Sequence, residues 1–492
     1  MNIKEAKEEV IRTVKAYLLK DETGEYVIPV ERQRPLLLIG PPGIGKTAIM
    51  EQAARECGIN LVSYTITHHT RQSAVGLPRL AQKQYGDRNV YVTEYTMSEI
   101  IASVYDQIER SHVQEGILFL DEINCVSETL APTMLQFLQY KTFGPHRAPD
   151  GFIIVTAGNP PQYNRSVRDF DIVTLDRVRK IEIEEDYDAW KEYAYRIGIH
   201  GAVLAYLEIK RENFYSIRQE IGGRRFVTAR GWEDLSRMIQ VSETLSLPVS
   251  AEQIVQFLQD PEIAQDFADY YELYKRYLDI YRIPAVLAGD FPEDSSGTLK
   301  HAPFDEKLSF LGLMIDALGQ DFRTYVQELE TQKALFALLK EAGAKSDESG
   351  IFTDSVKYIA AREKLQLAQQ KSAGMISRED EKIRARALQL FDRETPESYD
   401  AARSWFQERE ARRREQIRET DAHLTNSFRY LDRVFGEGQE MVIFLSELSA
   451  GYYSLRFVNE CGSEEYMHYN RLLLLKDRNE ELRREILQEM EL

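Results

Sequence analysis

The stretch of sequence that decides the fold is Gly40-Pro41-Pro42-Gly43-Ile44-Gly45-Lys46-Thr47. It fits the pattern G-x-x-x-x-G-K-[ST] and follows a short apolar run. Glycines let backbone N–H groups converge on a phosphate, and the start of a following helix adds partial positive charge. In such a loop we expect Lys46 to reach the β and γ phosphates and Thr47 to ligate Mg²⁺. The stretch therefore predicts a loop that binds a nucleoside triphosphate.

Short apolar runs surround this loop and indicate strands. They lie at residues 36–39, 61–64, 117–120, 153–157 and 178–183, with helical segments between them. This alternation is typical of an α/β fold with a doubly wound, mostly parallel sheet. Ligands of such sheets bind beyond the carboxyl ends of the strands. We therefore expect the functional residues just after each run.

Two carboxylates, Asp121 and Glu122, directly follow the run at 117–120. In enzymes with this phosphate loop, an acid at the end of a strand holds the metal ion, which makes Asp121 a candidate for the Mg²⁺ site. Glu122 is placed to accept a proton from the water that attacks the γ phosphate. The alternative interpretation is an acidic strand end exposed to solvent.

Further polar residues follow the later runs. Asn159 comes after the run at 153–157, where it could position the attacking water, although an asparagine before proline is also a common turn former. Arg177 and Arg179 come next, and Arg230 lies in the helical region beyond. A guanidinium group can neutralise charge on a transferring phosphoryl group, and a neighbouring subunit can supply it. A lone arginine is otherwise a common partner in a surface ion pair.

Taken in order, the motifs GPPGIGKT, ILFLDEIN, VTAGNP, LDRVR and VTAR resemble AAA+ ATPases of the MoxR type, which belong to the dynein-related branch with an insert in helix 2. The resemblance spans about residues 30–240. It implies an αβα nucleotide domain that binds ATP and Mg²⁺, a helical lid, and assembly into a ring that is commonly a hexamer. It makes Asn159 the sensor-1 residue, Arg177 the arginine finger and Arg230 the sensor-2 arginine. The family has an aromatic residue after the Asp-Arg pair of the finger, whereas this chain has Val178 and Arg179, so either arginine fits that role.

The resemblance also gives a meaning to residues 67–78, which follow the second predicted strand. They occupy the position of the helix-2 insert, a loop and hairpin that faces the central pore of the ring, with residues 85–96 as the hairpin. His69 and Arg71 are candidates for contact with a substrate or partner, and structural packing is the alternative. Adjacent histidines on a strand point to opposite faces, which disfavours a shared metal ion.

The length and patterning of the chain predict three domains. Residues 1–185 are expected to form the AAA+ nucleotide-binding α/β domain, 186–285 the helical lid, and 286–492 a mainly helical interaction domain. An aromatic stripe in the predicted helix Pro261–Tyr281 favours packing over a cofactor site. The Pro/Gly/Ser-bearing segment 290–297 predicts a break between the last two domains.

Composition limits the possible partners. The formal net charge of −18 over 492 residues repels a polyanion on average, which disfavours nucleic acid. Three scattered cysteines point to a reducing compartment, and no stretch reaches the roughly 18 apolar residues of a membrane span. We therefore expect a cytoplasmic protein.

Several functions agree with these features. The first is an ATP hydrolase that remodels or activates a partner protein in a chaperone-like role, and the resemblance implies a partner that frequently bears a von Willebrand A domain. The alternative is a nucleic-acid-associated AAA motor or a GTP-dependent subunit. A small-molecule kinase would need neither Glu122 nor so long a C-terminal region. A nucleotide-gated scaffold with little turnover is the remaining possibility.

Overall fold

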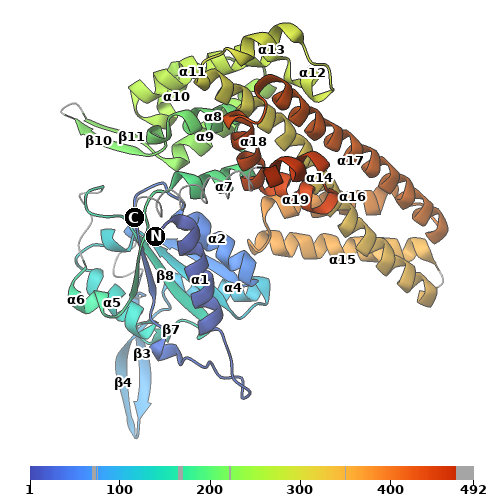
Figure 1. Ribbon diagram of the computed structural model, residues 1–492. Coiled ribbons are helices and arrows are strands. Elements are labelled where there is room, and N and C mark those ends of the chain that lie inside the picture. Colours follow the sequence, from blue (N-terminus) through green and yellow to red (C-terminus); the bar gives the residue numbers. More distant parts are fainter. Residues whose placement is uncertain (69–73, 75, 164–169, 221–222, 350, 473–492) are drawn as a thin grey trace, which may run out of the picture. The chain divides into compact units, whose positions relative to one another are not determined.

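A computed structural model of the chain describes residues 1–68, 74, 76–163, 170–220, 223–349 and 351–472 (Figure 1). The chain divides into two compact units. The first comprises Met1–Ala189 and Ala361–Lys382, and the second comprises Trp190–Ala360 and Ile383–Leu492. The first unit thus includes a segment from late in the sequence, which the contiguous boundaries expected from the sequence do not contain. The three-domain division stays a prediction.

A parallel sheet of five strands forms the centre of the first unit. The strands are β1 Leu36–Ile39, β2 Asn60–Thr65, β5 Gly116–Asp121, β8 Phe152–Gly158 and β9 Arg179–Glu182, in the order β2-β5-β8-β1-β9. All five apolar runs predicted as strands are therefore strands, and the predicted α/β fold is confirmed. Every residue of β8 is buried, because this strand has neighbours on both edges and helices beside the sheet.

Helices flank this sheet (Figure 1). They are α1 Ile3–Tyr17, α2 Lys46–Cys57, α4 Glu99–Ser111, α5 Ala131–Tyr140 and the short α6 Ile172–Leu175. α1 begins with a capping box, in which Asn2 and Glu5 each accept a hydrogen bond from the other's backbone N–H. Ser98 caps α4 through the N–H of Ile101. These local caps explain why both helices begin where they do.

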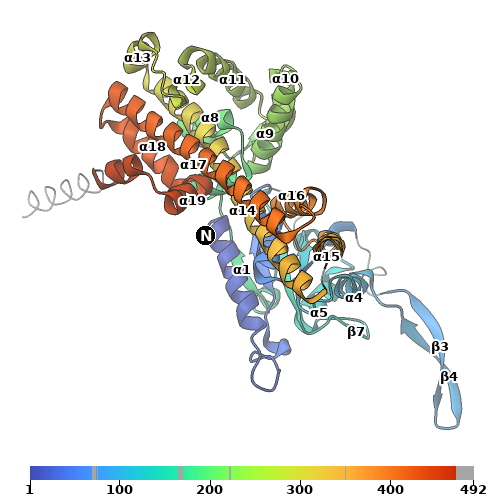
Figure 2. The same cartoon turned by 90° about the vertical axis from the view of Figure 1, so that its right-hand side faces the viewer.

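Two antiparallel strand pairs complete the first unit. β6 Thr142–Phe143 pairs with β7 His146–Arg147, and β3 Pro78–Tyr85 pairs with β4 Arg88–Tyr95. The second pair projects from the sheet as a hairpin (Figure 2). It begins at Pro78 rather than near residue 85, so the expected hairpin 85–96 covers only its turn and second strand. The pairing is continuous from Pro78 with Tyr95 to Tyr85 with Arg88.

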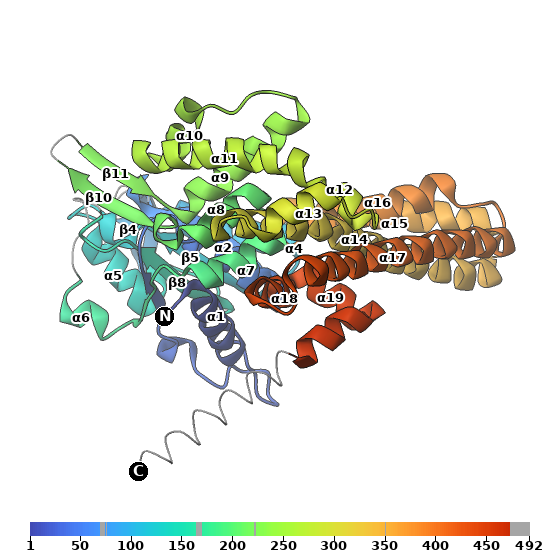
Figure 3. The ribbon, with the colours of Figure 1, turned by 45° about the horizontal axis from the view of Figure 1, so that its top comes forward.

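The second unit is mainly helical (Figure 3). It begins within α7 Tyr187–Ile197, at Trp190. Its other helices are α8 Gly201–Ile209, α9 Ala229–Thr244, α10 Ala251–Leu258, α11 Pro261–Tyr281, α12 Ile283–Leu287, α13 Glu293–Lys300, α14 Phe304–Ser349, α15 Phe352–Ser372, α16 Arg378–Glu394, α17 Tyr399–Phe435, α18 Gln439–Ala450 and α19 Tyr452–Cys461. α15 and α16 extend into the first unit. β10 Ser216–Glu220 and β11 Gly223–Val227 form an antiparallel pair.

The helix predicted at Pro261–Tyr281 is α11, and the mainly helical character expected of the later chain is confirmed. The break expected at 290–297 is wrong in its second half, because α13 begins at Glu293, directly after Pro292. Proline before a first helical turn is compatible with helix, since the N–H groups of that turn have no intrahelical partner. The Pro and Ser signals therefore mark the start of a helix as well as a break.

Aromatic packing holds the early part of the second unit together. Phe267, Tyr271, Tyr274 and Tyr281 of α11 are buried. The ring of Phe267 meets those of Tyr206 and Trp232, both at 5.3 Å between centroids. The stripe thus packs in a core, as expected. In the part of the chain that the structure describes, no helix is both long enough and apolar enough to cross a membrane.

Candidate nucleotide-binding site

The phosphate loop connects the end of β1 to the start of α2. Gly45 precedes α2 with φ 97°, a left-handed backbone conformation that costs free energy in residues with a Cβ. Among the described residues, no side chain caps the N-terminus of α2, and no acidic residue lies in its first turn. The backbone N–H groups there are therefore available to an anion.

The register of the sheet brings three strand ends to one edge. Ile39 of β1 pairs with Gly158 of β8, and Leu120 of β5 pairs with Thr156 of β8. The residues that follow these strands consequently lie beside one another. The phosphate loop, Asp121 and Asn159 meet at this edge although 113 residues separate Lys46 from Asn159.

Lys46 is the centre of this cluster. Its buried ammonium group donates to the carbonyl oxygens of Gly40 and Pro41, at 2.8 and 2.7 Å, and to Oδ1 of Asn159, at 2.9 Å. These contacts hold the amine over the loop and join it to the predicted sensor-1 side chain. The two residues predicted for phosphate binding and water positioning are thus direct neighbours.

Thr47 and Asp121 form the second pair. The Thr47 hydroxyl donates to Oδ2 of Asp121 at 3.1 Å. A hydroxyl and a carboxylate oxygen this close are hard ligands of the kind that Mg²⁺ prefers, and Mg²⁺ usually takes its remaining ligands from water and phosphate. The described residues contain no cluster of three or more His, Cys, Asp or Glu side chains suited to a metal ion. The two oxygens therefore fit a metal that arrives with a nucleotide.

Glu122 has an unusual backbone. Its φ of 57° and ψ of 36° lie in the left-handed region, and it precedes a 3-10 turn at Ile123–Cys125. Its N–H donates to Oδ1 of Asp121 at 2.9 Å. Other residues with positive φ, such as His112 and Lys141, terminate helices, where this conformation is common. At Glu122 the left-handed conformation turns the chain directly after β5. Residues other than glycine in such strained conformations cluster at functional sites.

Sequence reasoning missed Asn124, which supports the site from below. Asn124 is 5% exposed, and its Nδ2 donates to the backbone oxygen of Asn159 at 2.8 Å. A Cβ on Gly158 would lie 2.5 Å from Oδ1 of Asn124, so only glycine fits there. Among the described residues, Oδ1 of Asn124 has no hydrogen-bond partner. The signal was present in the sequence as an amide two residues after Glu122.

The two candidate finger arginines differ in their contacts. Arg179 donates through Nη1 to Thr13 at 2.9 Å and forms an ion pair with Glu9, both on α1. Hydrogen bonds to Tyr17 and Glu9 raise the pKa of Arg179 above its ordinary value, although burial opposes them. Arg177 is half-buried between α6 and β9 and forms no ion pair within the described part of the chain. Arg179 is thus already paired within its own chain.

The remaining predicted residues lie apart from this cluster or outside the described chain. Arg230 is exposed in the first turn of α9, in the second unit, where Thr228 caps the helix. His69 and Arg71 are outside the described residues. The hairpin that follows exposes apolar side chains, among them Leu80 and Tyr91 at 77% and 72%.

Comparison with known proteins agrees with this geometry. Residues 36–175 match the family described as ATPase family associated with various cellular activities (AAA). Over 121 residues the chain is 31% identical to ATPase family gene 2 protein homolog B of Mus musculus. That match covers 25% of this chain and 12% of the length of the mouse protein. The chain therefore carries an AAA ATPase domain, whose general activity is ATP hydrolysis.

Proposed function

We propose that the chain is an AAA+ ATPase of the MoxR type that couples ATP hydrolysis to the remodelling or activation of a partner protein. The observation that carries this proposal is the meeting of Lys46 with Asn159, and of Thr47 with Asp121, at one edge of the sheet. These pairs bring together a cation, a polar amide and two oxygens of the kind that Mg²⁺ prefers.

Each side chain then has a role. The N–H groups of the phosphate loop and the Lys46 ammonium hold the β and γ phosphates of ATP. Thr47 and Asp121 would hold Mg²⁺, which would neutralise charge on the phosphate oxygens. Asn159 orients the attacking water, and Asn124 fixes Asn159 through its backbone oxygen. Glu122 accepts the proton of that water.

We assign the arginine finger to Arg177, acting on the ATP of a neighbouring subunit in a ring that is commonly a hexamer in the family. The contacts of Arg179 with Glu9 and Thr13 support this choice, since a finger must be free to reach another subunit's nucleotide. A finger contributes about 10³ to 10⁵ in rate. Arg230 is assigned as the sensor-2 arginine on its motif alone.

The β3–β4 hairpin is the proposed surface for contact with the partner protein. Its exposed Leu80 and Tyr91 offer apolar anchors on a projecting element. The family resemblance points to a partner with a von Willebrand A domain. The cytoplasm is the proposed compartment because Cys57, Cys125 and Cys461 are free thiols.

The test measures ATP turnover together with molecular mass by light scattering, with and without ATP and Mg²⁺. Glu122→Gln should bind ATP, lose turnover by about 10²- to 10⁴-fold, and accumulate as a ring. Glu128→Gln, which removes an exposed carboxylate six residues away, should behave as the wild type. Unchanged hydrolysis in Glu122→Gln would contradict the base. A monomer that hydrolyses ATP at full rate would contradict the ring, and a preference for GTP would favour the GTP-dependent alternative.

A further inference from the structure

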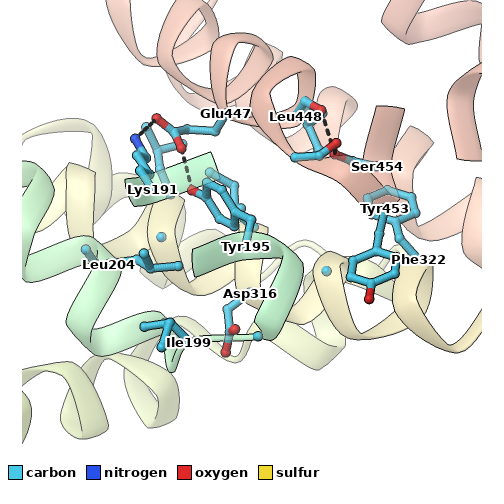
Figure 4. Close-up of a pocket in the computed structure, with 18 of the residues that line it drawn as sticks. Lys191, Tyr195, Ile199, Leu204, Asp316, Phe322, Glu447, Leu448, Tyr453 and Ser454 are labelled. Atoms are coloured by element: carbon cyan, nitrogen blue, oxygen red, sulfur yellow. Dashed lines mark hydrogen bonds and ion pairs between the residues drawn. The ribbon is translucent and has the colours of Figure 1, made fainter. Parts of the chain in front are cut away.

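The second unit contains a cavity that the proposed ATPase chemistry does not use (Figure 4). Its volume is about 90 Å³, and it lies among α7, α8, α14, α18 and α19. On the same scale one water needs roughly 10–15 Å³, so the cavity admits a molecule of several non-hydrogen atoms. Leu204, Leu311, Ile315 and Phe322 give it an apolar wall.

One side of the cavity carries a satisfied polar network (Figure 4). Lys191 donates to Glu208 at 2.6 Å and to Glu447, and the Tyr195 hydroxyl also donates to Glu447. The hydrogen bonds and positive charge of Lys191 lower the pKa of Glu208, although burial opposes them. Both carboxylates are therefore already paired within the protein.

Asp316 is different. It lines the cavity from α14, and among the described residues its carboxylate accepts no hydrogen bond and has no ion-pair partner. Desolvation by the surrounding protein raises its pKa above the ordinary value. A Cβ on Gly201 would lie 2.5 Å from the Tyr274 hydroxyl and 2.8 Å from Cγ of Asp316, so these groups converge there. The Tyr274 hydroxyl is likewise buried without a partner in the described chain.

The other cation at the wall, Arg323, acts on Asp316 through its positive charge, but within the described residues it forms no hydrogen bond or ion pair with that carboxylate. Arg323 donates to the backbone oxygen of Arg196 at 2.8 Å and lies over the ring of Tyr453 at 5.1 Å. Lys191 and Arg323 face three acidic side chains, so the formal charge of the lining is negative. A carboxylate in an apolar, partly aromatic cavity is complementary to a cation with an apolar body.

We propose that this cavity binds a small primary alkylammonium ion, with the ammonium group on Asp316 and the alkyl chain against the apolar wall. The ammonium group donates to the unpartnered carboxylate and compensates its buried charge. The alkyl chain of the ligand fills the cavity between α8 and α14. This site is independent of the ATP site, because every residue that forms it belongs to the second unit.

The first experiment titrates the whole chain with n-butylammonium chloride by calorimetry and follows the thermal midpoint. 1-Butanol and sodium butyrate are the matched probes, since they share the alkyl chain and lack the positive charge. We expect saturable binding and a rise in the midpoint with butylammonium alone. Asp316→Asn keeps the shape of the side chain and should weaken binding about 10- to 100-fold, the range for loss of a hydrogen bond to a charged group.

A second variant blocks the cavity without touching Asp316. Gly319 lines the cavity, and a Cβ there would meet nothing within 4 Å, so Gly319→Leu should fill the space without a clash. It should abolish binding and leave the fold intact, since glycine within a helix is less stable than leucine. Gly297→Leu is the control, because its Cβ also meets nothing within 4 Å and it lies on α13, away from the cavity.

Three outcomes would overturn the proposal. The first is the absence of saturable binding by butylammonium, and the second is equal binding of butanol. The third is unchanged binding in Asp316→Asn or Gly319→Leu when both retain the wild-type circular dichroism spectrum. ATP turnover of both variants should equal that of the wild type, so failure of this site leaves the proposed ATPase function unaffected.

Discussion

Replacing Glu122 with glycine should stabilise the first unit relative to replacing it with alanine, and both changes should abolish ATP turnover. Both variants remove the carboxylate that we assign as the base. They differ only in Cβ, and Cβ is what makes φ 57° and ψ 36° costly. Comparing them separates the strain at this residue from its chemistry.

The magnitude follows from two opposing terms. A residue with a Cβ in the left-handed region costs about 1–2 kcal/mol, which glycine removes. Glycine also gives the unfolded chain more freedom, which costs about 0.5–1 kcal/mol relative to alanine. The middle values of the two ranges differ by about 0.75 kcal/mol in favour of glycine, or about 1.5–3 °C in the unfolding midpoint of a unit this size.

The assay is thermal unfolding of both variants together with their ATP turnover. Glu109 is the control position, because it is exposed within α4 and its replacement by glycine should be less stable than by alanine by about 1 kcal/mol. The sign of the glycine–alanine difference should therefore reverse between Glu122 and Glu109. If alanine is the more stable residue at both positions, no strain is stored at Glu122. If either Glu122 variant keeps its turnover, the base is another group.

Three further predictions concern the same unit. Arg177→Ala should lower ATP turnover by about 10³- to 10⁵-fold and spare ATP binding. Arg179→Ala should keep turnover within about tenfold and lower the free energy of unfolding by about 0–1 kcal/mol, because it loses its contact with α1. The reverse pattern in a turnover assay would reassign the finger. Gly158→Ala should lower the free energy of unfolding, measured with denaturant, by about 1–3 kcal/mol, because the new Cβ would clash with Asn124. The double variant with Asn124→Ala should lose less stability than the sum of the two single variants. Strict additivity would argue against the clash. Burial lowers the pKa of Lys141 from 10.5 to about 8. Between these two pH values the unfolded chain binds more protons than the folded chain, so the free energy of unfolding rises with pH, by about 2 kcal/mol between pH 7 and pH 10. Lys141→Met should remove this rise, and an unchanged pH profile of stability in that variant would contradict the prediction.

The sequence alone was enough to predict those parts of the candidate site whose geometry is local. The phosphate loop is readable because Gly45 must adopt positive φ directly before a helix, and a strand and a helix on either side complete the signal. Asp121 could be placed for the same reason, since the apolar run before it ends where the strand ends. The five strands were also predictable, because buried parallel strands are short, apolar and separated by helices.

The order of those strands depends on pairing between distant segments, and only the tertiary structure decided it. β8 lies between β5 and β1, which brings Asn159 onto Lys46 and Asn124 beneath Asn159. No local pattern distinguishes Arg177 from Arg179, because the difference is an ion pair with Glu9, 170 residues away. The same holds for the cavity around Asp316, whose wall comes from helices far apart in the chain. Local sequence determines conformation, whereas the partners of a side chain depend on which surfaces the folded chain buries together.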